Sequence, residues 1–357
     1  MYAERTWQRG SIASAWQTPW LLSKRWDLTY ISLSAILVPV PFLLYQLFSR
    51  YGVPGGIVDP VGAVDILVAI AVGGPHMCST YTLTFMNRNF TRRYPVYVGF
   101  ALLLPVLVTI LGLVNLTLLL TVFMMWASVH VLHQIAYIAD CYRVKGNDYQ
   151  SLFSRLIDYG VIFTSLYPMA VVKLVANEFV ISGTRITIPF IVGQYWCIYA
   201  AHALFFSFLA LFIAKTALEV QQRRANFPKT LLMVITICLA YIVPSARNLD
   251  VAFQGMNVWH SFQYLGLTWY LNRLRLERGE VTSEIVRRIT SQERGLQFYL
   301  FNVGLTLSAG VMAVLLNVGL GLPWIQSYYI VILSCLLIHY YFDHFLFTRI
   351  QEMAGAT

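Results

Sequence analysis

Charged side chains are scarce in this chain. They make up 11% of its 357 residues, whereas 58% of the residues are hydrophobic. An ordinary water-soluble domain carries about 25% charged residues, so this composition excludes that class. The sequence therefore predicts an integral membrane protein.

Several functional signatures are also missing. There is no Walker lysine motif, no glycine-rich turn between a strand and a helix, and no nucleophile-elbow serine motif. The histidine boxes of the classical membrane desaturases and hydroxylases are absent, and the closest histidine pair is His130-x-x-His133. The five cysteines form no CxxC pair, which argues against a disulfide framework. These absences disfavour nucleotide-dependent, serine-hydrolase and classical desaturase chemistry.

Long apolar runs are what the sequence has in abundance. A helix needs about 20 mostly apolar residues to cross a bilayer. By that criterion we predict an all-α, polytopic membrane bundle of about ten transmembrane helices. The predicted spans are 28–49, 63–86, 96–113, 115–141, 152–176, 190–215, 230–246, 249–272, 297–320 and 326–348.

The distribution of lysine and arginine predicts the orientation. With ten spans, 21 of these residues fall on one side and four on the other. Loops that stay in the cytoplasm carry the positive excess, so both termini are predicted to be cytoplasmic. The same rule accounts for the net charge of +9, and no nucleic-acid partner is expected. In a bacterium, the membrane would be the plasma (inner) membrane.

The spans divide the chain into five segments. Residues 1–27, rich in tryptophan and basic residues, predict an interfacial segment, and 28–273 hold the first eight spans. Residues 274–296 form the only long polar insertion and predict a cytoplasmic hairpin or amphipathic helix. Spans nine and ten occupy 297–349, and 350–357 form a tail.

All seven histidines lie on even-numbered predicted spans. For six of them, the next basic residue toward the cytoplasm is 10 to 13 positions away. At about 1.5 Å rise per residue, these six share one layer about 15–20 Å from the cytoplasmic edge. Ionisable residues inside a membrane usually face a bundle interior, where neutral imidazoles bind transition metals. The predicted metal ligands are His76, His130, His133, His202, His260 and His339.

Helical spacing groups some of these residues. His130 and His133 stand at i, i+3, and His339 and Asp343 stand at i, i+4, so each pair can serve one site. His344 is rotated about 140° from His339 and lies nearer the surface, so it is the weakest candidate ligand. His202 has no polar neighbour at helical spacing, which leaves a packing role open as well.

Other polar residues near this layer are predicted to support the ligands. A ligating imidazole usually donates its second N–H to an acceptor, and Gln134, Gln263 and Asp343 are placed for that. Tyr137 and Tyr264 are predicted either to hydrogen-bond a bound oxygen species or to anchor the helices.

The stretch Gly73-Gly74-Pro75-His76 places a proline inside the second span, where it frees a backbone carbonyl and opens the helix locally. It resembles the glycine-x-proline-histidine motif of the Brp/Blh family of membrane β-carotene 15,15'-dioxygenases. The resemblance implies a multi-histidine helical bundle in which His76 is a site residue. Met77-Cys78-Ser79-Thr80 departs from the family, which usually continues with small residues and an acidic one.

The leading hypothesis is an O2-dependent oxidoreductase, with a mononuclear or dinuclear iron site, that acts on a carotenoid, isoprenoid or acyl lipid. Ligands that are all histidine would favour dioxygenase cleavage, whereas two metals sharing Asp343 would favour hydroxylation or desaturation. A redox partner at the cytoplasmic face is compatible with this chemistry. Two alternatives stay open, namely a haem-binding electron-transfer or haem-handling protein and a metal transporter.

Overall fold

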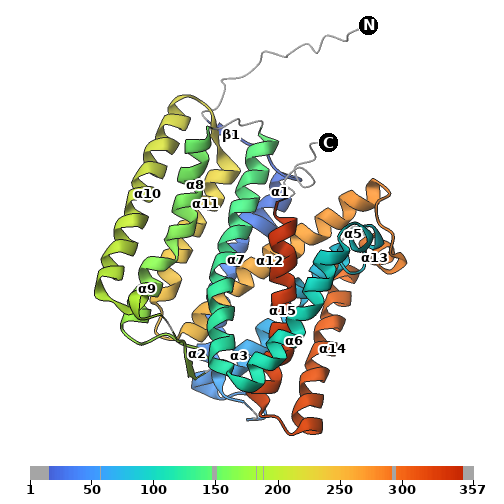
Figure 1. Cartoon of the computed structure of the whole chain (residues 1–357). Coiled ribbons are helices and arrows are strands. Elements are labelled where there is room, and N and C mark those ends of the chain that lie inside the picture. The colour runs from blue at the N-terminus through green and yellow to red at the C-terminus, as the bar shows by residue number, and fades with distance from the viewer. Residues whose placement is uncertain are drawn as a thin grey trace.

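The computed structural model describes residues 16–56, 58–146, 151–181, 183–187, 189–291 and 295–348. Within these ranges the chain is a bundle of long helices (Figure 1), so the all-α prediction is confirmed. The four strands that it contains have two residues each. β1 (Trp16–Gln17) pairs in parallel with β4 (Ala225–Asn226), and β2 (Val180–Ile181) pairs antiparallel with β3 (Thr184–Arg185).

Nine helical stretches in the described part of the chain are long and apolar enough to cross a bilayer. They correspond to nine of the ten predicted spans. Five are single helices and a sixth is nearly so: α6 (Pro95–Val114), α7 (Leu116–Lys145), α10 (Tyr195–Gln221), α14 (Leu296–Leu320), α15 (Trp324–Leu346), and α11 (Phe227–Ile242) with the 3-10 turn η5 (Val243–Ser245).

The other three stretches are interrupted helices. Their parts are α1 (Lys24–Trp26), η1 (Asp27–Ser32), η2 (Leu33–Leu37) and α2 (Pro39–Tyr51); α3 (Pro60–Val68), η3 (Ala69–Gly73) and α4 (Gly74–Leu83); and α8 (Leu152–Ser165) with α9 (Tyr167–Val175). Short helices α5 (Arg88–Arg93) and α13 (Glu284–Thr290) and the turn η4 (Phe190–Gly193) complete the fold.

The remaining predicted span is α12 (Leu249–Glu277), which is long enough to cross a bilayer but is not among the nine apolar stretches. It packs against α2, α3 and α4 and lies in the interior of the bundle. A helix surrounded by other helices need not be apolar, because its polar side chains meet protein rather than lipid. α12 therefore supplies much of the polar interior.

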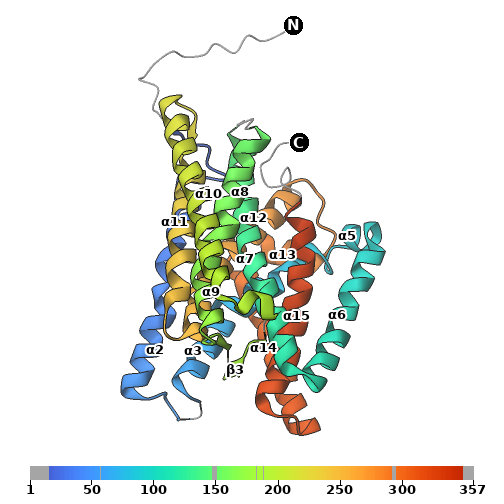
Figure 2. The ribbon, with the colours of Figure 1, turned by 60° about the vertical axis from the view of Figure 1, so that its left-hand side comes forward.

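The helices form three groups in Figures 1 and 2. α8, α10 and α11 stand on one side, α5, α6 and α14 on the other, and α7, α12 and α15 lie between them. Large apolar side chains cover the outer faces, and Leu103 on α6, Leu204 on α10 and Leu315 on α14 are each more than half exposed. Such surfaces suit contact with lipid, which supports a membrane-embedded protein.

Successive helices run in alternating directions, so their ends collect at two ends of the bundle (Figure 1). The end that contains α1, α5, α13, the last turn of α7 and the first turn of α8 holds most of the described lysines and arginines, and we call it the basic end. The opposite end holds four basic residues and four acidic residues. They are Arg50, Lys173, Arg185, Arg247, Asp59, Asp65, Glu178 and Asp250.

Two polar segments, the one before the first span and the insertion 274–296, have regular structure in their described residues. The carboxylate of Asp27 accepts hydrogen bonds from the backbone of Leu21 (2.7 Å) and Leu22 (3.2 Å), which fixes the chain before the first span. In the insertion 274–296, α12 continues to Glu277 and α13 follows after Ser283 caps its first turn. The first 15 residues of the predicted interfacial segment and the tail 350–357 lie outside the described residues.

Candidate metal centre

Pro75 shapes the backbone that carries His76. Proline has no N–H to donate, and the turn before it widens into the π-helical segment η3. The carbonyl of Gly73 then accepts a hydrogen bond from Nδ1 of His76. This bond places the proton on Nδ1 and leaves the lone pair of Nε2 available to a ligand.

Gly74 allows this turn to approach α14 closely. A Cβ atom at Gly74 would lie 2.1 Å from Cγ2 of Thr306, so no larger residue fits without movement. The expected local opening of the helix at Gly73-Gly74-Pro75-His76 is thus present, and it is held against a neighbouring helix.

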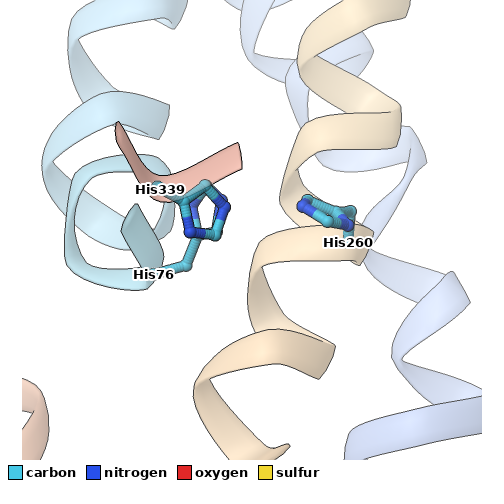
Figure 3. Close-up of side chains that lie close together, drawn as sticks. All are labelled: His76, His260 and His339. Carbon is cyan, nitrogen blue, oxygen red and sulfur yellow. The ribbon is translucent and has the colours of Figure 1, made fainter. Parts of the chain in front are cut away.

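Four imidazoles meet inside the bundle, one each from α4, α7, α12 and α15. The ring centroid of His339 lies 4.7 Å from that of His76 and 4.8 Å from that of His130. His260 completes the group, 5.2 Å from His76 and 4.9 Å from His130. All four residues are buried, and Figure 3 shows three of the rings facing one another. We call these residues the histidine cluster.

Asp343 joins the histidine cluster one turn after His339. Its Oδ2 lies 3.5 Å from Nδ1 of His339 and 3.9 Å from Nε2 of His130. These distances exceed those of hydrogen bonds, but they place the carboxylate within reach of an ion bound to the rings. The sequence predicted Asp343 as a supporting residue, and its position also allows it to be a ligand.

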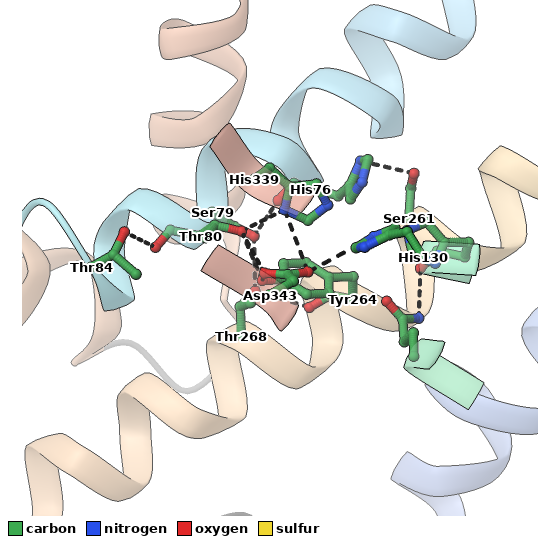
Figure 4. Close-up of polar contacts among 12 residues, drawn as sticks. His76, Ser79, Thr80, Thr84, His130, Ser261, Tyr264, Thr268, His339 and Asp343 are labelled. Carbon is green, nitrogen blue, oxygen red and sulfur yellow. Dashed lines mark hydrogen bonds and ion pairs between the residues drawn. The ribbon is translucent and has the colours of Figure 1, made fainter. Parts of the chain in front are cut away.

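Hydrogen bonds on the other side of Asp343 fix the carboxylate (Figure 4). The hydroxyl of Tyr264 donates to Oδ1, and Thr80 Oγ1 donates to the same oxygen at 3.3 Å. Thr80 Oγ1 also lies 2.7 Å from the Tyr264 hydroxyl and 2.7 Å from Nδ1 of His339. One threonine thus ties together α4, α12 and α15.

Several atoms of the cluster have no hydrogen-bond partner among the described residues. They are Nε2 of His76, Nδ1 of His260, Nε2 of His339 and Oδ2 of Asp343. Buried polar atoms without partners are costly, and they are rare unless an ion or another group satisfies them. The ligand atoms also form two compact sets, each within 4.8 Å: His76 with His260 and His339, and His130 with His339 and Asp343. This donor chemistry fits a transition-metal ion.

His133 and His202 do not join the histidine cluster. The ring of His133 contacts His344 and Phe347, with centroids 5.3 and 5.2 Å apart. His202 contacts Tyr241 on α11, and its Nδ1 donates to the carbonyl of Ile198 (2.8 Å). The prediction that all six histidines of the layer share one site is therefore not matched by their positions.

Gln134, Gln263 and Tyr137, which were predicted to support the ligands, lie near the histidine cluster but do not all contact the imidazole rings. Gln134 donates to the carbonyl of His260 (3.2 Å) and to Gln263 (3.1 Å), and Gln263 donates to the carbonyl of Ile31 (2.6 Å). Gln134 therefore braces the backbone of α12 and Gln263 that of η1, and neither amide is bonded to an imidazole ring. Tyr137 stacks on Phe347, with ring centroids 4.9 Å apart, which is consistent with the anchoring role.

The sequence analysis missed the hydroxyl partners of the cluster. Thr80 follows His76 by one turn of α4, and Ser261, the residue after His260, lies 2.9 Å from Nδ1 of His76. Serine and threonine are ordinary inside membrane helices, so only their spacing from a histidine could have signalled this role.

An apolar cavity of about 250 Å³ ends at the histidine cluster. It is lined by side chains of α7, α9, η5 and α12, with Met125 and Phe253 among them, and by Leu166 between α8 and α9, and it reaches His260 and Tyr340. Tyr340 in turn stacks on the ring of His130, with centroids 4.1 Å apart. A lipophilic molecule in this cavity would touch the cluster directly.

No protein-family model, curated protein or solved structure matches the chain. The resemblance to the Brp/Blh family therefore stays an expectation carried by Gly73-Gly74-Pro75-His76 alone.

Proposed function

We propose that this protein is a membrane-embedded, metal-dependent oxidoreductase that uses O2 to modify a lipophilic substrate. The observation that carries the proposal is the meeting of four buried imidazoles and one carboxylate from four helices beside an apolar cavity. Polar groups this deep in an apolar bundle are costly and usually functional.

The donor set favours iron. Imidazole with carboxylate suits iron more than it suits the hard cations that prefer oxygen ligands alone. His76, His260 and His339 would hold one ion, and His130, His339 and Asp343 would hold a second. Iron bound there would supply the O2 and one-electron chemistry that amino-acid side chains lack.

The protein's own residues would bind the lipid substrate and orient the ligands of the metal. The apolar cavity would hold a lipid chain with its reacting carbon next to His260, and the buried walls would exclude bulk water. Thr80 and Tyr264 would keep Asp343 in place. Because the Tyr264 hydroxyl already donates to Asp343, we assign this tyrosine a positioning role rather than contact with an oxygen species.

The place of Asp343 bears on the reaction class. A ligand set of histidines alone would favour dioxygenase cleavage, whereas a carboxylate shared within the site favours hydroxylation or desaturation. Asp343 lies within 3.9 Å of both His130 and His339, which supports the second class.

The haem alternative fits the site less well, and the transporter alternative differs from the proposal in what becomes of the ion. A haem would need two histidines on opposite faces of a porphyrin, but the four rings contact each other and leave no room for one. A metal transporter would release its ion, whereas a resident cofactor stays bound through purification.

Three measurements test the proposal on detergent-purified protein. Elemental analysis should find iron, and an absorption spectrum should lack a Soret band. Added carotenoid, isoprenoid or acyl lipid should stimulate O2 consumption when a reduced ferredoxin supplies the two electrons that hydroxylation or desaturation requires. An intense Soret band would favour the haem alternative. Metal that crosses liposome membranes down its gradient would favour the transporter.

A further inference from the structure

A second cavity, of about 90 Å³, reaches the histidine cluster from another direction. His76 lies at its inner part, and Asp65, Asp250, Gln254 and Asn257 contribute polar groups to its wall. Asp65 and Asp250 are half-buried, whereas His76 is 2% exposed. The cavity therefore passes from accessible carboxylates to a buried imidazole.

The acidic part lies toward the end opposite the basic end. Asp250 is in the first turn of α12, and Asp65 is in the second turn of α3. His76 follows Asp65 by eleven residues along the same interrupted helix, which corresponds to about 16 Å. The cavity thus connects that end of the bundle with the depth of the cluster.

Hydrogen bonds join the polar groups of the wall into a chain. Gln254 donates to Asp65 (2.9 Å), and Asn257 donates to the side-chain oxygen of Gln254 (3.1 Å). Ser261 donates to Asn257 (3.0 Å) and lies 2.9 Å from Nδ1 of His76. Positions 250, 254 and 257 line the cavity from one face of α12, and Ser261 on the same face links them to His76.

We propose that this second cavity, along the polar part of its wall, is the route by which a divalent transition-metal ion reaches the histidine cluster. The inference rests on the proposed function, because it takes the cluster to be a metal site. Carboxylate and amide oxygens can replace the water shell of a cation step by step. At the inner end, Nε2 of His76 is buried and has no hydrogen-bond partner among the described residues, so it can receive the ion.

The charge distribution gives the route its direction. The basic end repels cations, whereas the opposite end has as many acidic as basic residues and places two acids at this cavity. The apolar cavity is unsuited to a cation, because no carboxylate is among its lining residues. The two cavities would then serve different molecules, one the lipid and the other the ion.

The test measures how fast the metal binds. Protein stripped with a chelator is mixed with Co²⁺ in detergent at low salt, and its visible absorption is followed by stopped flow. Asp65→Asn with Asp250→Asn should slow association about tenfold, because the negative charge that this carboxylate pair carries is lost. The final Co²⁺ content should equal that of the wild type, since neither residue is a proposed ligand of the cluster.

Glu178→Gln is the matched control. Glu178 is an acid of the same end that pairs with Lys173 (2.7 Å) and does not line the cavity, so its loss should leave the rate unchanged. Should the double Asn variant fail to fold by gel filtration, the wild type alone still decides, because its rate must fall as salt screens the carboxylates.

Four results would overturn the route. They are a wild-type rate in the folded double variant, equal slowing in Glu178→Gln, a wild-type rate independent of salt, and slowing in His344→Ala, which would place uptake at the basic end. A wild-type protein that binds no Co²⁺ at any time would instead refute the metal centre and, with it, the proposed function.

Discussion

Nε2 of His130 and Nε2 of His260 face each other 3.2 Å apart, although the two residues come from different helices and are 130 positions apart in the sequence. Two imidazole nitrogens that bind one ion at about 2.0–2.1 Å stand about 3–3.4 Å apart in octahedral or tetrahedral geometry. The two side chains thus stand at the spacing that a shared ion requires, so one ion bound by both is the alternative to two ions held by the separate ligand sets. A neutral pair could also share one hydrogen bond, and the following variants separate the two cases.

Alanine at His76, His130, His260 or His339 is expected to remove most of the bound metal. Each change deletes a ligand from a buried site where water cannot easily replace it. Metal content per chain, measured by elemental analysis after gel filtration, checks this. His202→Ala is the control, because His202 lies in the same predicted layer but contacts Tyr241 instead. Equal metal content in all five variants would mean that the cluster is packing.

His133→Ala is expected to keep nearly full metal content, as is His344→Ala. For His133 this result would reverse the expectation from helical spacing, because its ring contacts His344 and Phe347 rather than the cluster. The same elemental analysis checks both variants. Loss of metal in His133→Ala with retention in His130→Ala would contradict the assignment.

Asp343→Asn is expected to weaken metal affinity by about 10–100-fold, the usual effect of losing a carboxylate that supports or completes a metal site. Tyr264→Phe should act in the same direction but less strongly, because Thr80 still donates to Asp343. Competition with a coloured chelator measures both. Tyr299→Phe, which removes a hydroxyl bonded to the carbonyl of Ala71 at 2.9 Å, should have no effect.

Gly74→Ala is expected to lower the free energy of unfolding by about 1–3 kcal/mol, the usual cost of overpacking. The new Cβ would lie 2.1 Å from Thr306, and the backbone oxygen of Ala69 stands 2.8 Å away. Gly304→Ala on the facing helix α14 meets nothing within 4 Å, so it should leave stability unchanged or raise it by up to about 1 kcal/mol. Thermal unfolding in one detergent compares the two. Equal melting temperatures would show that the α4–α14 contact is not tight.

Ala170→Trp is expected to fill the apolar cavity and to weaken lipid binding by about tenfold or more without loss of metal. Fluorescence titration with parinaric acid, a polyene fatty acid, measures the binding. Ala200→Trp on the exposed face of α10 is the control. Unchanged binding in Ala170→Trp would place the lipid site elsewhere.

Much of the helical framework follows from the sequence, because long apolar runs have few alternatives to a helix in a bilayer. α12 shows the limit of that argument. Its polar residues reduce its hydropathy, yet they belong to the interior, and only its basic boundary and the alternation of charged loops marked it as a span. The orientation of the bundle in the membrane stays a prediction, because it rests on loop charge alone.

The sequence predicts how deep each histidine lies in the membrane, but not toward which neighbouring helix its side chain points. Counting residues to the basic edge placed His76, His130, His260 and His339 at one level, and the structure brings them together. The same count included His202 and His133. Three residues turn a helix by about 300°, so His133 points about 60° away from His130, and that difference carries it to His344. His202 was misplaced for another reason. The face that α10 turns toward the bundle is set by its packing against segments far away in the sequence, and a local sequence pattern does not contain that information.

Transition-metal content of the wild-type protein tests the central claim most directly. Protein purified without chelators, then incubated with Fe²⁺ under anaerobic conditions and freed of excess metal, would be compared with a variant carrying both His76→Ala and His339→Ala. About one or two equivalents of metal per chain are expected in the wild type, with little in the variant. Less than about a tenth of an equivalent in the wild type, or equal content in both proteins, would contradict a histidine-ligated metal centre.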